Sequence, residues 1–513
     1  MKVDHEARGQ ASALPAEGQT HSIARNSLFA LAAQLTSAAF TAVLTLFLVR
    51  ALDPTGYGTF ALALALGALL VLPSDLGISM SASRFIAERR GDLEGVAGVF
   101  ADALRLKLLA AGTLSIGLVA AAGPLASGYG NDDLAWPIRG VAIAVFGQSL
   151  MLLFGGAFVA QGRTAANLRI ALMESAVETG ASIALVLLGA GAAGAAFGRA
   201  IGYAVGAAIG LALLLRFLGL SLSTLRRTRA GLGRRIVRYA GPLFVIEAAF
   251  ALFVQVDAII IGVFLTTTSV GLFQAPMQLM TFLHYPGLAL ALGVAPRLVR
   301  HERQEPRVGA FLTALRALVL FQAALVPPLV VWADPIVELV LGSDYAESAD
   351  VLRALTPYVF LLGLAPLVSL AANYMGVAGR RVPIALAAVS VNAAIDVVLV
   401  PEIGIVAGAI GTGVAFGIYV PAHLWICRDV LGVSLRPLLL TLVRASVAAA
   451  AMAGVLLTFG TADLALGEWI VGSAAAGLAY LAVLLATREV GRTEARTAWS
   501  AVSGLLPGRA SPS

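Results

Sequence analysis

Residues 47–60 read FLVRALDPTGYGTF and join two long apolar segments through a turn. The flanking segments, 26–49 and 57–80, carry almost no charge. A helix of about 20 apolar residues spans the roughly 30 Å hydrocarbon core of a bilayer, so each segment predicts one transmembrane helix. Asp53, Pro54 and Gly56 are typical turn residues. The stretch therefore predicts a hairpin of two membrane-spanning helices.

The composition extends this prediction to the whole chain of 513 residues. Hydrophobic residues make up 59% and charged residues 12%, with a mean hydropathy of +0.90. A soluble domain is about 25% charged, so the chain lacks the surface of a soluble protein. Its 54 glycines suit helices that pack closely in lipid. The single cysteine, Cys427, excludes a disulfide framework. We expect an all-α polytopic membrane protein.

The apolar segments predict about 14 transmembrane helices, arranged as two six-helix lobes followed by two further helices. Their ranges are 26–49, 57–80, 103–122, 138–160, 168–189, 192–215, 240–264, 269–293, 310–332, 352–375, 382–400, 404–426, 438–459 and 467–486.

Basic residues predict the orientation. Of the 35 Lys and Arg residues, only Arg50, Arg139 and Arg353 fall in alternate loops that are otherwise neutral or acidic, and Arg199 lies within a span. Basic loops stay in the cytoplasm, so both termini are expected there, in a multi-pass protein of the cell (inner) membrane. Since topology explains the basic residues, no nucleic-acid partner is expected.

The same pattern predicts the domain organisation. Gly58-Thr59-Phe60 opens the second span, and Gly271-Leu272-Phe273 opens the eighth in the same way. This repetition predicts two lobes related by an axis along the membrane normal. The expected parts are a disordered cytoplasmic tail (1–25), an N-terminal lobe (26–216), a basic cytoplasmic linker (217–239), a C-terminal lobe (240–426), two additional helices (438–486) and a cytoplasmic tail (487–513).

Catalytic patterns are missing from the sequence. The histidines are scattered, no phosphate-binding loop ends in Gly-Lys-Ser/Thr, and the outside loops are too short to be catalytic domains. We therefore expect no enzyme activity, no cofactor and no metal site.

Several short motifs in fixed order carry a family resemblance. After the opening hairpin come Ser74–Ile78, Asp257–Phe264, Gly342–Tyr345, Ala378–Arg381 and Pro401–Ala409. Together, over residues 22–430, they resemble the polysaccharide transporter family. These oligosaccharide-lipid flippases belong to the multidrug/oligosaccharidyl-lipid/polysaccharide exporter superfamily. The resemblance implies a V-shaped bundle of two lobes that alternates between inward-open and outward-open states.

Charged and polar residues inside spans are the first candidates for a substrate path, because each charge costs about 2.5–3.5 kcal/mol to insert. Glu174 and Glu178 share one face of the fifth span, and Arg199 on the sixth is placed to pair with one of them. The remaining candidates are Glu247, Asp257, Asn392 and Asp396. They either line a cavity, contacting sugar or a coupling cation, or form structural pairs, with Asp257 tying its helix to a neighbour.

Three more residues complete the candidate path. Arg50 and Arg139 lie outside against the topological rule, so they are candidates to grip substrate phosphates. Gln274 suits sugar hydroxyls, and serves equally as a contact between helices. Since the buried charges are mostly acidic, a close relationship to peptidoglycan-precursor flippases, which are expected to have a cationic lumen, is in doubt.

The predicted function is to flip a lipid-linked (undecaprenyl-pyrophosphate) oligosaccharide to the outer leaflet by alternating access, for lipopolysaccharide or exopolysaccharide biosynthesis. Expected partners are this substrate, membrane lipids and a glycan polymerase or export machinery. The alternatives are a cation-coupled multidrug exporter, which an acidic lumen favours, and a membrane enzyme of glycan assembly.

Overall fold

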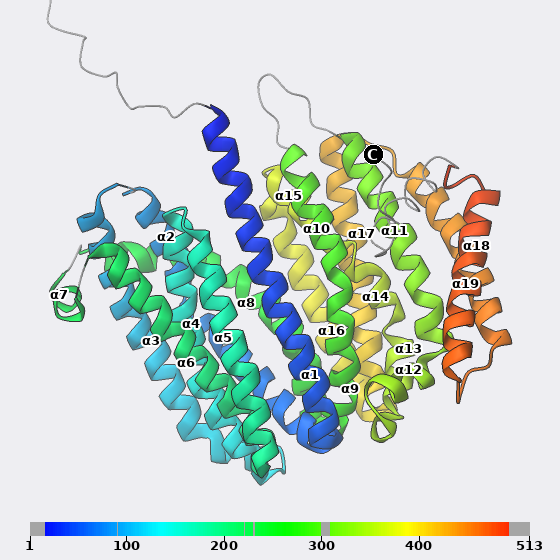
Figure 1. Cartoon of the computed structure of the whole chain (residues 1–513), viewed down its shortest axis with the longest axis horizontal. Coiled ribbons are helices and arrows are strands. Elements are labelled where there is room, and N and C mark those ends of the chain that lie inside the picture. Colours follow the sequence, from blue (N-terminus) through cyan, green and yellow to red (C-terminus); the bar gives the residue numbers. More distant parts are fainter. Residues whose placement is uncertain (1–15, 90, 220, 229–230, 299–307, 492–513) are drawn as a thin grey trace, which may run out of the picture. The chain divides into compact units, whose positions relative to one another are not determined.

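The computed structural model describes residues 16–89, 91–219, 221–228, 231–298 and 308–491, and every regular element in these ranges is helical (Figure 1). The α-helices are α1 (Ala16–Asp75), α2 (Ile78–Ala87), α3 (Leu93–Gly128), α4 (Ala135–Ala160), α5 (Thr164–Leu185), α6 (Gly191–Leu218), α7 (Leu222–Arg227), α8 (Gly233–Phe264), α9 (Thr267–Met280), α10 (Tyr285–Val294), α11 (Val308–Val331), α12 (Ala333–Val340), α13 (Ser348–Ala354), α14 (Thr356–Leu362), α15 (Ala365–Tyr374), α16 (Arg381–Ile403), α17 (Val406–Leu431), α18 (Arg436–Thr458) and α19 (Leu466–Ala486).

The described ranges contain 11 helical segments long and apolar enough to cross a membrane, which confirms the all-α polytopic class. Two of these segments break near the middle. α1 is interrupted at Asp53, whose φ is 54°, and the Gly189 region (Val186–Ala190) separates α5 from α6. Both breaks fall where the sequence predicted the end of one span and the start of the next. The total of 14 spans stays a prediction.

Two helices begin earlier than predicted. α1 starts at Ala16, so it includes the last part of the predicted 1–25 tail; residues 1–15 lie outside the described ranges. α3 starts at Leu93, ten residues before the predicted span, because Asp92 caps it by accepting a hydrogen bond from the Gly95 N–H. Lys107, near the start of the predicted span 103–122, therefore lies well inside the helix. The predicted linker also contains helical segments, α7 and the start of α8.

The chain divides into two compact units. Unit 1 comprises Met1–Leu44 and Gly67–Ala248, and unit 2 comprises Thr45–Leu66 and Ala249–Ser513. The middle of α1 thus belongs with the second half of the chain. The predicted lobe boundaries at 216 and 240 remain predictions.

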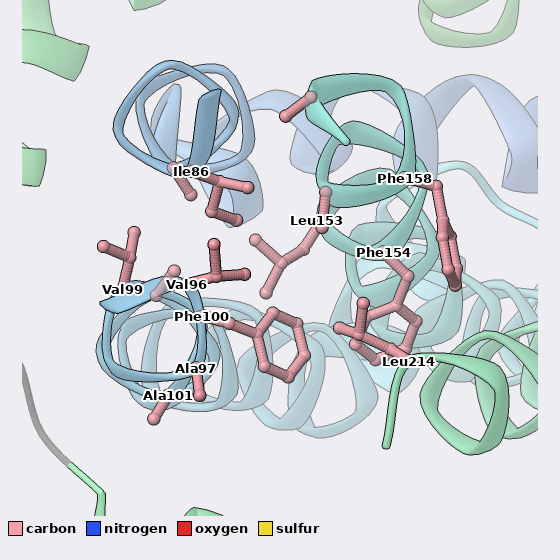
Figure 2. Packing of buried hydrophobic residues seen from close by; sticks show 14 of the residues in the cluster. Ile86, Val96, Ala97, Val99, Phe100, Ala101, Leu153, Phe154, Phe158 and Leu214 are labelled. Atoms are coloured by element: carbon pink, nitrogen blue, oxygen red, sulfur yellow. The ribbon is translucent and has the colours of Figure 1, made fainter. Parts of the chain in front are cut away.

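Unit 1 combines an apolar cluster with close helix contacts. Ile86, Phe100, Leu153 and Phe154 from α2, α3 and α4 pack together (Figure 2), with the Phe100 and Phe154 rings 5.8 Å apart. Glycines at 198, 202 and 206 of α6 face α5, where an added Cβ would overlap Ser182, Glu178 and Glu174 respectively. Small residues are what allow helices to pack closely in lipid. This contact positions the glutamates discussed below.

In unit 2, α18 packs against α11 and α19 packs against α18, and Figure 1 shows α18 and α19 as neighbouring orange and red ribbons. Trp332, which follows α11, lies edge-on to Trp469 of α19, with the ring centroids 5.1 Å apart. The indole N–H of Trp332 donates to the Gly460 carbonyl at 3.1 Å. Helices α18 and α19 are therefore bound into unit 2.

The repeated glycine motif meets its own counterpart within unit 2. The Thr55 and Thr268 hydroxyls, 213 residues apart in sequence, are 2.9 Å from each other. Gly58 and Gly271 have the same separation, and a side chain on either would overlap the backbone beside the other. The two copies of the motif therefore contact each other, and the repeat of whole lobes stays a prediction.

One further helix pair matches in detail. α6 of unit 1 and α17 of unit 2 each follow a glycine region with positive φ, at Gly191 and Gly404, and each ends at a left-handed glycine, at Gly219 and Gly432. Both separations are again 213 residues, so Arg199 corresponds to Thr412.

Candidate functional site

A cluster of buried polar side chains lies inside unit 2. Asp257 of α8, 3% exposed, accepts one hydrogen bond from the Asn392 amide and one from the Thr412 hydroxyl, each at 2.6 Å. Asn392 and Asp396 are fully buried on one face of α16. Asp257 therefore does tie α8 to α16 and α17, as one of the two interpretations of the sequence held.

The carboxyl oxygens of Asp396 are available as acceptors. Neither of its carboxyl oxygens accepts a hydrogen bond in the described part of the chain, and the Asn392 carbonyl oxygen accepts none either. Both residues point toward Gly411 of α17, where an added Cβ would overlap Asp396 and lie 2.7 Å from the Asn392 oxygen. The Asp396 carboxyl group lies against that of Asp257 instead, and two adjacent buried acids cannot both be ionised without a large cost. Two carboxyl groups, an amide oxygen and a hydroxyl form an oxygen shell suited to a hard cation or to a proton shared by the acids.

Unit 1 carries the second cluster. The Arg199 guanidinium of α6 donates to Glu178 of α5 at 2.5 Å and to the Tyr203 hydroxyl at 3.0 Å. Glu174, one turn before Glu178, accepts from the Ser175 hydroxyl at 2.9 Å. Both glutamates are buried, at 5% and 8% exposed. The predicted pairing of Arg199 with a glutamate of the fifth span is present, with Glu178 as the partner.

Both arginines proposed as phosphate ligands contact other groups of the protein, and their role toward phosphate stays a prediction. Arg50 donates to the Leu339 carbonyl and, at 3.2 Å, to that of Val340. These are the last carbonyls of α12, so Arg50 caps the negative end of that helix. The Arg139 guanidinium lies 4.5 Å from the ring centre of Trp136.

Gln274 is half-buried on α9. The side chain of Glu247 lies outside the described residues.

Sequence reasoning missed one buried pair in unit 1. Lys107 of α3 is fully buried and forms an ion pair with Asp75, and its ammonium donates to the Ser149 hydroxyl at 2.9 Å. The positive-inside count had explained Lys107 as a topology signal. The available signal was the pair itself: one acid near the end of a predicted span and one lysine near the start of the next.

A second missed cluster surrounds Glu489, just after α19. Its carboxylate accepts from Arg316 at 2.8 Å, from Thr441 at 2.6 Å and from Arg444 at 2.8 Å. Burial acts to raise the pKa of Glu489, but these hydrogen bonds and the Arg316 charge outweigh it and lower the pKa below its usual value. The cluster joins α11, α18 and the end of α19, which is a structural role.

The described residues contain no group of three or more His, Cys, Asp or Glu side chains with metal-ligand geometry.

Residues 23–295, more than half of the chain, match the family model described as polysaccharide biosynthesis protein. The chain belongs to that family. No curated protein matches it in sequence.

Solved structures show the fold. A structure of the lipid II flippase MurJ in an inward closed conformation superposes with a TM-score of 0.73 at 14% identity, covering 90% of this chain and 99% of that one. An inward-facing multidrug resistance transporter of the MATE family superposes with 0.62 at 17% identity, covering 77% and 95%. An outward-facing MATE structure gives 0.53 at 17% identity, covering 80% and 96%. The chain therefore has the fold of the MOP superfamily and is a multi-pass membrane protein.

Proposed function

We propose that this protein flips a lipid-linked oligosaccharide, carried on undecaprenyl pyrophosphate, from the inner to the outer leaflet of the cytoplasmic membrane. The observation that carries the proposal is the combination of a polysaccharide biosynthesis family match with a fold found in a structure named a lipid flippase. The family match supports the class of product, and the shared fold supports the kind of step. Lipopolysaccharide or exopolysaccharide synthesis would use such a step.

A flippase that works against a gradient needs a source of energy, and the unit 2 cluster is suited to one. Asp257 and Asp396 are two buried acids that a cation would stabilise strongly. A cation that binds one conformation better than another shifts the equilibrium by its difference in affinity. We assign Asp257, Asn392, Asp396 and Thr412 to a coupling-cation site, with the cation as co-substrate.

The orientation and partners of the protein follow the same proposal. Cytoplasmic termini would place the loops rich in arginine on the side where the lipid-linked sugar is made. A glycan polymerase or export machinery would take up the sugar outside.

A second candidate, a cation-coupled drug exporter, is favoured by the uncompensated acids of unit 2 and by the shared fold with the multidrug transporters. The two functions differ in cargo. Drug-dependent proton or sodium flux through the purified protein, without movement of lipid-linked sugar, would favour export.

The test is a reconstitution. Liposomes with the full-length protein receive an undecaprenyl-pyrophosphate oligosaccharide that carries a fluorophore, and a membrane-impermeant quencher reports the leaflet that exposes the glycan. We expect the protein to accelerate exchange at least tenfold over protein-free liposomes. No acceleration with several such lipids would refute the proposal.

A further inference from the structure

A polar cluster that the proposed function does not use surrounds Arg381, the first residue of α16 in unit 2. Its guanidinium donates from Nη1 to the Asn373 amide oxygen at 2.6 Å, from Nη2 to the Tyr419 hydroxyl at 3.1 Å and from Nε to Nε2 of His423 at 3.1 Å. The Tyr419 hydroxyl in turn lies 3.0 Å from that of Ser369 on α15. Contacts from α15 and α17 therefore fix the orientation of the guanidinium.

The acceptors around Arg381 are all neutral. Because a guanidinium only donates, Nε2 of His423 must accept, and the ring proton is on Nδ1, which donates to the Tyr419 carbonyl at 2.7 Å. His423 is thus an uncharged imidazole, and it is fully buried. No carboxylate is among the partners found for Arg381 in the described residues.

The neighbouring arginine differs in this respect. The Arg380 guanidinium donates to the Asp429 carboxylate of α17 at 2.7 Å and lies 5.7 Å from the ring centre of Trp425. Asp429 therefore neutralises Arg380 and leaves Arg381 as it is. Of two adjacent arginines, one has a counter-ion in the protein, whereas the other has a fixed orientation and neutral partners.

The Arg381 guanidinium retains N–H groups for a ligand. It has five N–H groups, and its bonds within the described residues use three of them, so one is left on each terminal nitrogen. Such a pair of N–H groups matches two oxygens of a phosphate. Arg381 is also half-buried, and a partly buried cation is stabilised by an anion that comes from outside the protein.

We propose that Arg381, oriented by Asn373, Tyr419 and His423, binds the phosphate group of a lipid at the end of unit 2 where α16 begins and α17 ends. Two lipids carry this chemistry: the pyrophosphate-linked sugar, which rests on the proposed function, and an anionic phospholipid of the surrounding membrane, which does not. Basic side chains between helices on the cytoplasmic side are typical headgroup sites. The orientation predicted from the sequence places this end of unit 2 on that side.

The test measures lipid binding to the purified full-length protein in a non-ionic detergent by native mass spectrometry. The probes are undecaprenyl pyrophosphate and phosphatidylglycerol. Undecaprenol and diacylglycerol, which lack the phosphate, are the reference lipids. We expect the wild type to bind at least one of the two probes about tenfold more tightly than its reference lipid, as for hydrogen bonds to a charged group.

Two variants change the charge that the ligand meets. Asn373→Asp gives Arg381 a carboxylate partner of the same shape, on an exposed residue where folding should be undisturbed, and Arg381→Gln removes the cation itself. Each should weaken binding of the phosphate lipid about tenfold. The matched controls are Ser434→Asp, which adds the same negative charge to an exposed residue at this end of unit 2, and Arg380→Gln. Both controls should stay within about twofold.

The two probes distinguish the source of the phosphate. A loss confined to undecaprenyl pyrophosphate would assign the site to the transported lipid, a loss confined to phosphatidylglycerol would assign it to the membrane, and a loss for both would indicate a site without headgroup preference. Each of these results supports a phosphate site.

Other results would overturn the proposal. They are unchanged binding in either Asn373→Asp or Arg381→Gln, an equal loss in Ser434→Asp or Arg380→Gln, or a wild type that binds the lipids without phosphate equally well. No probe carries a glycan and none is transported. A negative result therefore leaves the flipping assay to decide the proposed function separately.

Discussion

The buried acids of unit 1 and unit 2 have opposite electrostatic surroundings. Glu178 has a permanent partner in Arg199 at 2.5 Å, whereas Asp396 accepts no hydrogen bond in the described part of the chain. Removing one partner of a buried ion pair is costly, while an unpaired buried acid is itself a cost to the fold. The comparison indicates that the acid in unit 1 has a fixed partner in the protein, whereas the acids in unit 2 are suited to a cation that binds and leaves.

The largest expected effect concerns transport. Asp396→Asn removes one of the two carboxyl groups of the unit 2 cluster while keeping the shape of the side chain. We expect the cation-driven rate of flipping in liposomes to fall at least tenfold. Glu402→Gln, an exposed acid near the end of the same helix, is the matched control and should stay within about twofold. Equal flipping rates in the wild type, Asp396→Asn and Glu402→Gln would contradict a role of the unit 2 cluster in transport.

Substitutions in the two buried clusters should change the free energy of unfolding in opposite directions. Arg199→Thr leaves Glu178 buried and unpaired, and we expect it to lower the free energy of unfolding by about 3 kcal/mol, the low end for a broken buried pair because the arginine is partly exposed. Asp396→Asn removes a buried acid that has no basic partner in the described residues and should be neutral or stabilising. Unfolding in mixed detergent micelles measures both. A similar loss for the two variants would contradict the distinction.

Glu489 offers a third acid with permanent partners, and it lies outside the spans. Since its pKa is lowered in the folded protein, its stabilisation is complete above the ordinary value of 4.5 and is lost as the pH falls through the lower folded value. Glu489→Gln should cost about 2–3 kcal/mol at neutral pH, because it weakens bonds to Arg316 and Arg444. It should also flatten the acid limb of a plot of melting temperature against pH.

If the acid limb of that plot is unchanged in Glu489→Gln, other carboxyl groups govern the acid response.

The smallest expected effect comes from single hydroxyl groups. Thr412→Val removes one donor from the buried carboxylate of Asp257 and should cost about 1–2 kcal/mol. Ser175→Ala removes the corresponding kind of donor from Glu174 in unit 1, where Arg199 lies nearby, and should cost less. Thermal unfolding of both variants measures the difference. A larger loss for Ser175→Ala would reverse the assignment of the uncompensated site to unit 2.

Local spacing predicted much of this arrangement. Pairs of polar residues four apart, Glu174 with Glu178 and Asn392 with Asp396, share a helix face in any apolar span, and a lone arginine in the next span needs a partner. The hairpin at Asp53 was equally local: the Gly56 N–H donates to the Asp53 carboxylate at 2.8 Å.

The sequence contains no comparable local pattern that predicts long-range contacts. Thr412 is one of many hydroxyl groups in apolar spans, and its bond to Asp257 joins residues 155 apart. Arg50 donates to carbonyls at the end of α12, 290 residues away in sequence for Val340, a contact that no local pattern marks. The ion pair of Lys107 with Asp75 joins α3 to the end of α1, and no local spacing marks it. Such assignments require the packed structure.

The most direct test of the account is the cation dependence of glycan flipping. Liposomes containing the labelled undecaprenyl-pyrophosphate oligosaccharide would be given a sodium or proton gradient in either direction, with wild-type protein and with Asp396→Asn. The account predicts that one gradient accelerates outward movement in the wild type and that the variant loses this response. Outward movement that ignores both gradients, or that Asp396→Asn leaves unchanged, would contradict it.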